Sequence, residues 1–341
     1  MQQELAADSA DDMFFPHQVL KIIAMGWNSL LNRTVSYDTE MLNEVNNIPE
    51  SKFAIVRNSN GDLGGIVSMI NYAANQAYCA VVQINQSISD KYISIESTDD
   101  PQCFQIVDVQ DVAEDTSLQP IFVQVHHNPK RLLALQHLVD EAAERTLGRL
   151  NLDLKKNITV DLTDNDDINV WRDKAGFVIR DKVQLCELTI DKNEFQKTLK
   201  TVGNVKISKF DGSQMGKLVR FDKAVSNADR KSFLEYLFRD ANVLIAENEE
   251  ISTVSGYGVF RKDRILAVYA NTKEIAHAIV QKILRTVNHD KITLCTIRNR
   301  WNIEQKSDIC CRQIIRLHTR ALPLGIVWDR IFVLNVGMNL I

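Results

Sequence analysis

The sequence predicts an α/β protein (α+β, mixed sheet) made of two similar units in tandem. Apolar runs of strand length alternate with amphipathic helical stretches. The order of hairpin strands, strand, helix, strand, helix and strand occurs before Asp191 and begins again after it. At 341 residues, 45% of them hydrophobic, the chain can bury two cores. We therefore divide it into a disordered, acidic tail at 1–12, a first domain at 13–192 and a second domain at 193–341.

Each element of the first domain is predicted from its apolar pattern and its boundary residues. A hairpin turns at Asn58-Ser59-Asn60-Gly61-Asp62, because asparagine and glycine tolerate the positive φ that such turns require. The expected elements are a helix from Pro16, hairpin strands within 52–72, a strand from Ala77, a strand at 122–127, a helix from Pro129 to Gly148, a strand at 157–162, a short capped helix at 164–176 and β-rich residues 177–190.

Residues 87–119 interrupt this order. They are polar, acidic and poorly periodic, so we interpret them as an inserted loop with one extra strand. The insertion is either an interaction element or a long solvated loop.

The second domain follows the same plan. Thr272 is the expected N-cap of a strongly amphipathic helix. The glycines of Gly256-Tyr257-Gly258 lie within a predicted hairpin, where glycine marks a bulge or a close approach of the backbone. The expected elements are a strand at 204–211, a helix at 227–240, strands with turns at 242–270, a helix at 272–287, a strand at 291–297 and a last strand within 327–338.

Composition limits the classes of partner. The net charge of -4 and the pI near 6.0 give no general electrostatic reason to expect DNA or an anionic membrane. No apolar stretch reaches the ~18 residues of a membrane span, and the acidic N-terminus is no secretory signal. We expect a cytoplasmic protein that can also enter the nucleus by diffusion.

The cysteines show no metal-binding pattern. No C-x-x-C pair is present, and no histidine stands at metal-ligand spacing from a cysteine. We predict reduced, mostly buried thiols and no metal site. The six are Cys79, Cys103, Cys186, Cys295, Cys310 and Cys311.

Several motifs together resemble a known family. They are Gly26-Trp27, the KFAIVRNSNGDLGGIVS hairpin, WRDKAGF at 171–177, SGYGVF at 255–260, VYANTKEIAHAIVQKIL at 268–284 and IVWDRIFVL at 326–334. With these motifs the chain resembles a tandem of GCN5-related N-acetyltransferase (GNAT) domains, similar to animal proteins, especially nematode ones, with a holothin-acyltransferase-type second domain. The resemblance spans nearly the whole chain and implies two acyl-CoA N-acyltransferase folds.

The resemblance implies a cofactor site at the strand-to-helix junction of the first domain. In the family, backbone N–H groups of a glycine-rich loop hold the acyl-CoA diphosphate there. The matching stretch here runs from Lys130 to Leu135 and has lost every glycine. Lys130 and Arg131 could neutralise phosphate or simply form a solvated helical turn. Leu132, Leu133 and Leu135 would crowd the cofactor or pack against the sheet.

The position of the family's general acid also departs from the pattern. Many members place a tyrosine where this chain has Trp171, and an indole N–H cannot act as an acid. We therefore expect Trp171 to be a packing residue. The second domain has no glycine loop either, which in this domain type implies a non-catalytic companion.

His126 and His127 are the candidate catalytic residues. A histidine at this strand end could be the general base that deprotonates a substrate ammonium. Adjacent strand residues face opposite sides, so at most one of them can point into a cleft. The alternative, which we favour, is a polar strand exit in which Asn128 caps the next helix and Pro129 is its first residue.

Another basic stretch has two interpretations. Arg298 and Arg300 stand beside Trp301, which could suit a nucleotide or nucleic acid. The acidic charge of the whole chain argues against nucleic acid.

Two hypotheses for function follow. The leading one is a pseudoenzyme: a degenerate tandem acetyltransferase fold that acts as a binding or scaffold module for a protein partner and requires no cofactor. The competing one is an active acetyl-CoA-dependent N-acetyltransferase (EC 2.3.1) acting on a small amine or a protein amine. An enzyme predicts an open V-shaped cleft between strands at 121–127 and 158–162, with free N–H groups at 131–135. A scaffold predicts that Leu132, Leu133 and Leu135 fill that cleft.

Overall fold

The fold is taken from a computed structural model. It describes residues 51–73, 75–101, 103–111, 132–148, 155–163, 166–200, 205–239, 241–248, 253–303 and 309–334. The predicted tail, the helix from Pro16 and the strand at 122–127 lie outside these residues.

The first half is a sheet covered on one face by a helix. Three antiparallel strands are followed, after an insertion, by the covering helix and by a strand that runs parallel to the third. These elements are β1 (Ser51–Arg57), β2 (Leu63–Ala73), β3 (Gln76–Ile84), α4 (Ala134–Leu147) and β7 (Asn157–Thr163). They are followed by α5 (Ile168–Asp173), β8 (Ile179–Arg180), β9 (Leu185–Asp191) and α6 (Lys192–Thr198).

The insertion forms a hairpin, so the prediction of a single extra strand is wrong. β4 (Lys91–Ser97) pairs antiparallel with β5 (Cys103–Asp111), and the start of β5 pairs parallel with β1. The short β6 (Leu132–Leu133) pairs with β4. Many of the hairpin's side chains are polar and exposed, which weakens the apolar alternation that would reveal the strands.

The second half repeats the plan of sheet and covering helices. Its elements are β10 (Lys206–Lys209), α7 (Met215–Ser226), α8 (Lys231–Phe238), β11 (Asn242–Asn248), β12 (Thr253–Arg261), β13 (Arg264–Ala270), α9 (Lys273–Thr286), β14 (Lys291–Ile297), β15 (Cys310–His318), a 3-10 turn at Trp328–Arg330 and β16 (Ile331–Val333). The sequence did not predict α6, α7 or β15.

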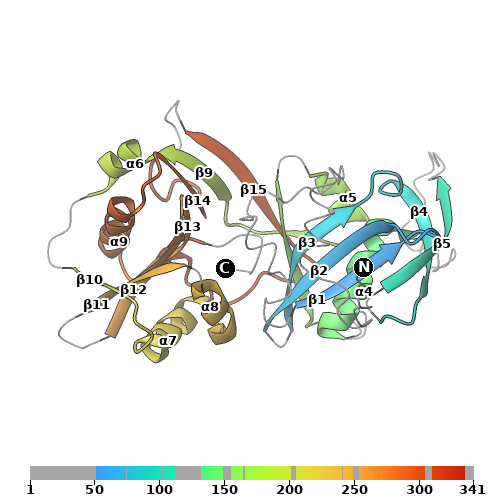
Figure 1. The fold of residues 1–341 in the computed structure, drawn as a ribbon, viewed down its shortest axis with the longest axis horizontal. Coiled ribbons are helices and arrows are strands. Elements are labelled where there is room, and N and C mark those ends of the chain that lie inside the picture. The colour runs from blue at the N-terminus through green and yellow to red at the C-terminus, as the bar shows by residue number, and fades with distance from the viewer. Residues whose placement is uncertain are drawn as a thin grey trace, which may run out of the picture.

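The two halves exchange strands. β9, from the first half of the chain, pairs antiparallel with β14, and β15, from the second half, pairs antiparallel with β7. β9 and β15 also pair with each other, so one continuous sheet crosses the molecule (Figure 1). The domain boundary at residue 192 remains a prediction, because the sheet continues across it.

A buried ion pair fastens the exchanged strand β15 to β7. Arg316 donates from Nε and Nη2 to the two carboxylate oxygens of Asp161, both at 2.7 Å. The Tyr78 hydroxyl donates to the same carboxylate at 2.7 Å. Next to them, His318 lies between the Thr159 hydroxyl, 2.8 Å from Nδ1, and Asp181, 3.2 Å from Nε2. All but Asp181 are buried. The bonds of Arg316 and His318 thus connect β15 with residues more than 130 positions earlier in the sequence.

Three apolar clusters form the core of the described part of the molecule. One lies under α4 in the first half and one under α9 in the second. The third contains residues of both halves, including Tyr78 and Tyr257. At the edge of this third cluster, the Tyr72 hydroxyl donates to the carbonyl of Ser226 at 3.2 Å. The halves are therefore joined by packing as well as by strand pairing.

Several local predictions are confirmed. Thr272 caps α9, and Gly148, with φ of 70°, ends α4. The predicted short capped helix is α5, and its N-cap residue, Asp167, accepts from the N–H groups of Asn169 and Val170. A Cβ on Gly258 would lie 2.4 Å from Ile279 Cγ2, so this glycine does mark a close approach of the strand to α9. Four cysteines are buried and two, Cys310 and Cys311, are exposed; all six are free thiols.

Candidate functional site: a basic pocket at the start of helix α9

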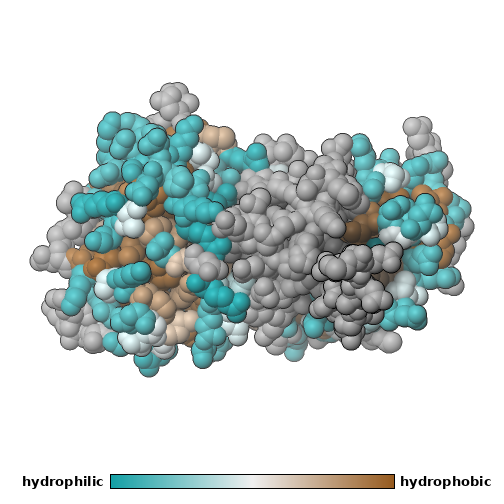
Figure 2. Space-filling view, in the orientation of Figure 1, coloured by the Kyte–Doolittle hydropathy of each residue, from teal (hydrophilic) through white to brown (hydrophobic). Residues whose placement is uncertain are grey.

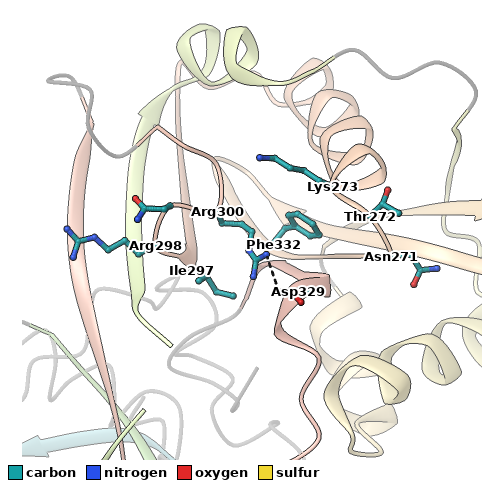
Figure 3. Close-up of a pocket in the computed structure, with 9 residues that line it drawn as sticks. Asn271, Thr272, Lys273, Ile297, Arg298, Arg300, Asp329 and Phe332 are labelled. Atoms are coloured by element: carbon teal, nitrogen blue, oxygen red, sulfur yellow. Dashed lines mark ion pairs between the residues drawn. The ribbon is translucent and has the colours of Figure 1, made fainter. Parts of the chain in front are cut away.

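A pocket of about 550 Å³ lies where β13 passes into α9. It is closed on the other side by the segment that follows β14 and by the end of the chain's described part (Figure 3). The lining residues are Asn271, Thr272, Lys273, Ile297, Arg298, Asn299, Arg300, Asp329 and Phe332.

The N-terminus of α9 lies at this pocket, because Asn271, Thr272 and Lys273 line it. Thr272 is extended, with φ of -139°, and its hydroxyl oxygen accepts from the N–H of Ile275 at 3.4 Å. The first N–H groups of a helix have no partner within the helix and carry a partial positive charge. A helix of 14 residues therefore presents a positive end to the pocket.

Arg300 is the most constrained of the basic residues. Its Nη2 donates to the carbonyl of Trp328 at 2.9 Å, and its guanidinium lies 5.4 Å from the centre of the Phe332 ring. Nη1 is 4.0 Å from a carboxylate oxygen of Asp329. Burial lowers the pKa of Arg300 from its ordinary value, while Asp329 opposes that shift. Arg300 is therefore a partly desolvated cation held in a fixed position.

Lys273 and Arg298 add two further positive charges. Lys273 is half-buried, and Figure 3 shows it on the α9 side of Arg300 and Phe332. Arg298 is exposed and is anchored by its backbone N–H, which donates to the carbonyl of Gln184 at 2.8 Å. Against these three cations stands one carboxylate, Asp329, whose side chain is 99% exposed. The pocket thus favours an anion such as a phosphate group.

The space beside this pocket is closed by strand β16. β13 and β14 run parallel and pair only over Arg264–Ile265 and Thr293–Leu294. Beyond these residues β16 pairs with β13, and Leu334 donates its N–H to the carbonyl of Cys295 in β14 at 3.0 Å. All three residues of β16 are buried. A strand therefore fills the opening that would form a V-shaped cleft in the second half.

The predicted cofactor stretch of the first half is partly described. Leu132 and Leu133 form β6 and pair with Ile93 and Tyr92 of β4, and α4 begins at Ala134. The predicted helix start at Pro129 is therefore wrong, because these leucines extend the sheet instead of the helix. Leu133 is buried, Leu132 is half-buried, and Leu135 belongs to the core under α4.

The remaining predicted site residues are His126, His127, Lys130 and Arg131, and they lie outside the described residues. Their roles stay predictions. The parallel neighbour of β7 over Asn157–Val160 is β3, not the predicted strand at 121–127. Strands β3 and β7 diverge beyond Cys79 and Val160, where they are no longer paired.

Trp171 is a packing residue, as predicted. Its side chain is fully buried and meets the Phe177 ring edge to face, with 5.1 Å between ring centres. Trp171 therefore belongs to the apolar core of the first half.

The sequence analysis noticed Arg298 and Arg300 but not their partners in the pocket. Lys273 and Asn271 were not predicted because a phosphate site at a strand-to-helix junction was expected to contain glycines. A better signal is the pairing of an N-capping threonine with a lysine immediately after it, at a junction of the same type.

Two further features bear on chemistry. Within the described ranges, no three His, Cys, Asp or Glu side chains gather as they would around a metal ion. Among the described helices, none combines the length and apolar character that crossing a membrane demands.

Comparison with known proteins supports the fold. Residues 218–307 match the model of the acetyltransferase (GNAT) domain, and residues 35–179 match a domain of unknown function, DUF7596. A Pyrococcus horikoshii protein provisionally assigned as an acetyltransferase superposes with a TM-score of 0.55 at 13% identity, over 96% of this chain and 94% of that one. A tandem GNAT protein from the clavulanic acid biosynthesis pathway gives 0.50 at 10% identity, over 92% and 96%. No curated protein matches the chain.

The fold is therefore a mixed α/β sheet structure composed of two GNAT-like domains. At these identities the structural matches define the fold alone. A basic pocket lies at the strand-to-helix junction between β13 and α9.

Acid is expected to destabilise the second half through His277, which lies on α9 beside the pocket. Its Nδ1 accepts from the N–H of Lys200 at 2.7 Å, so the ring is neutral there. Burial lowers the pKa of His277, Lys273 adds to the shift, and Glu274 opposes it. The unfolded chain takes up a proton first as pH falls through about 6.5, so stability is complete above that pH and is lost toward the lower folded pKa.

Urea unfolding from about pH 7.5 to about pH 5 measures this effect. The His277→Gln variant should lose less stability than the wild type across the interval. Parallel pH dependence of the two proteins would contradict the assignment.

Proposed function

We propose that this chain is a GNAT-fold pseudoenzyme that binds a phosphate-bearing ligand, such as an acyl-CoA, without transferring an acyl group. The observation that carries the proposal is the position of β16 between β13 and β14, with Phe332 forming part of the pocket wall. Phosphates can be held by Lys273, Arg300 and the N-terminus of α9. The acyl arm would have to displace a buried strand to reach the interior.

The first half supports the same proposal. Leu132 and Leu133 are engaged with β4 where an acyl-CoA site would need free backbone N–H groups. Trp171 stands at the position of the family's acid and is buried in the core. Acyl transfer would need both a cofactor site and a proton donor for the leaving thiolate.

Calorimetry on the full chain tests the binding. CoA and acetyl-CoA should bind with similar affinity, because the phosphates make the contacts. Lys273→Ala and Arg300→Ala should each weaken binding at least about tenfold, the loss of one charge-assisted contact. The matched control is Arg285→Ala, which removes an exposed arginine from the other end of the same helix and should bind normally.

Two results would overturn the proposal. One is the absence of any heat with CoA at millimolar concentration. The other is steady release of CoA from acetyl-CoA in the presence of an amine.

A second candidate function is acetyl-CoA-dependent transfer to a small amine or a protein amine in the first half. It is favoured by the divergence of β3 and β7 beyond Cys79 and Val160, because the family binds its acyl arm between diverging strands. His126 or His127 would be the base. In that case the rate of CoA release should decrease as the pH is lowered below about 6.5. This decrease should be absent in His126→Ala or in His127→Ala. Unchanged turnover in both variants would exclude a histidine base.

A further inference from the structure

Arg300 in the α9 pocket has fewer hydrogen-bond acceptors than donors. Its Nη2 donates to the carbonyl of Trp328 at 2.9 Å, but its Nε is buried and has no acceptor among the described residues. A carboxylate oxygen of Asp329 is 4.0 Å from Nη1, whereas a charge-assisted hydrogen bond is about 2.7–2.9 Å long. Asp329 therefore balances the charge of Arg300 without satisfying its donors.

Asp329 is free to move away from Arg300. Its side chain is 99% exposed, and it belongs to the 3-10 turn at Trp328–Arg330. In the view of Figure 3, Arg300 lies between this carboxylate and Lys273. An exposed ion pair contributes little to stability. A ligand with a better set of acceptor oxygens can therefore displace the carboxylate.

Glu274 is a second internal carboxylate, located at the N-terminus of α9. In the first turn, the N–H of Ala276 donates to the Thr272 carbonyl at 3.2 Å, and the N–H of Ile275 donates to the Thr272 hydroxyl at 3.4 Å. The pKa of Glu274 is lowered from its ordinary value, first by its own backbone N–H and then by the Thr272 hydroxyl. A ligand anion at this helix end must therefore compete with Glu274 as well.

The second half of the chain is strongly basic. Residues 193–341 carry 24 Lys and Arg and 15 Asp and Glu, a net charge of +9, whereas residues 1–192 carry 16 and 29, a net charge of -13. Hydrophilic side chains cover much of the second half in Figure 2. The charge of -4 for the entire chain conceals this separation. Anions in solution will concentrate around the half that contains the pocket.

We propose that Asp329 is a replaceable counter-ion that restricts the α9 pocket to phosphates carrying at least two negative charges. A bound phosphate takes the place of the carboxylate and comes within hydrogen-bond distance of the Arg300 guanidinium, while Asp329 turns to solvent. This inference rests on the proposed binding of a phosphate-bearing ligand. It names the class of phosphate and the residue that selects it.

Competition with a tethered carboxylate produces the selection. The chain holds Asp329 beside Arg300 at an effective concentration on the order of millimolar. A monoanion such as acetate offers Arg300 the same charge as the resident carboxylate, so the exchange is not favoured. A terminal phosphate or a diphosphate brings more charge and more acceptor oxygens, and Lys273 can share them with Arg300.

Calorimetry on the full chain with pyrophosphate and with acetate, at constant ionic strength, tests the inference. The wild type should bind pyrophosphate and give no saturable signal with acetate. Asp329→Asn should bind pyrophosphate at least about fivefold more tightly, the effect of one charge about 4 Å away in water. In this variant, millimolar acetate should also compete with pyrophosphate, because the resident anion is gone.

The matched control is Asp290→Asn. Asp290 is exposed just beyond the other end of α9, so its replacement changes the net charge equally and should leave both affinities unchanged. Glu274→Gln should tighten pyrophosphate binding as Asp329→Asn does.

Three results would overturn the inference. They are equal affinity of the wild type and Asp329→Asn for pyrophosphate, saturable binding of acetate by the wild type, and an equal gain of affinity in Asp290→Asn. Pyrophosphate binding by Asp329→Asn alone would support it, because the carboxylate would then block the site. A parallel titration with CoA separates the two proposals: if CoA binds but pyrophosphate binds neither protein, only this inference fails, and if CoA does not bind, the proposed function fails.

Discussion

Arg316→Met is expected to lower the free energy of unfolding by about 3–5 kcal/mol. The substitution leaves the buried Asp161 carboxylate with the Tyr78 hydroxyl at 2.7 Å but without its two guanidinium contacts at 2.7 Å. An uncompensated buried charge is costly because it has lost its hydration. Since Arg316 is on β15 and Asp161 is on β7, the loss should loosen the exchanged strand and the junction between the halves. Urea unfolding, followed by circular dichroism, measures the effect.

Two control variants test whether the unpaired buried charge causes this loss of stability. Arg312→Met changes a half-buried arginine on the same strand and should cost less than about 1 kcal/mol. The double variant Asp161→Leu, Arg316→Met removes both charges and should be more stable than Arg316→Met alone. If the double variant is the less stable of the two, the buried charge is not the cause.

Trp171→Ala should be similarly damaging, with a loss of about 3–5 kcal/mol. The indole is fully buried under α5 and packs edge to face on Phe177, so its removal leaves a large cavity. A matched control is Trp328→Ala, because Trp328 is only half-buried and its removal should cost clearly less. Equal losses at the two positions would show that burial does not determine the effect.

Trp171→Tyr introduces the tyrosine that the resemblance implies at this position. This variant tests whether the missing acid alone prevents acyl transfer. On the pseudoenzyme proposal the variant stays without acyl transfer, because Leu132 and Leu133 remain paired with β4. Release of CoA from acetyl-CoA by Trp171→Tyr, and not by the wild type, would show instead that only the acid is missing. That outcome would favour the enzyme hypothesis for the first half.

Elements with a strong period were predictable from the sequence alone. The helix at 272–287 was predicted with its cap because apolar residues recur on one face and Thr272 precedes them. The strands around residues 52–72 were predicted because apolar runs flank a turn of asparagine and glycine. The packing role of Trp171 was predictable because a large aromatic residue on a short amphipathic helix is usually buried.

Other elements were missed for identifiable reasons. β15 contains exposed Cys310 and Cys311 followed by RQIIRLH, which lacks a regular alternation of polar and apolar residues, and it is a strand because β9 and β7 pair with it. The helix in the first half was placed too early, because Asn128-Pro129 looks like a helix start whereas Leu132 and Leu133 pair with β4. In both cases a distant strand determined the local structure.

By itself the sequence determined the fold class and the repeated plan of the two halves, because these depend on residue type and on periodicity along the chain. Only the tertiary structure decided which strands meet across the two halves, that β16 closes the space beside α9, and that Lys273, Arg298 and Arg300 gather around one pocket. The physical reason is that backbone pairing and charge clustering join residues far apart in the chain. A local sequence pattern does not specify which distant segment a strand will pair with.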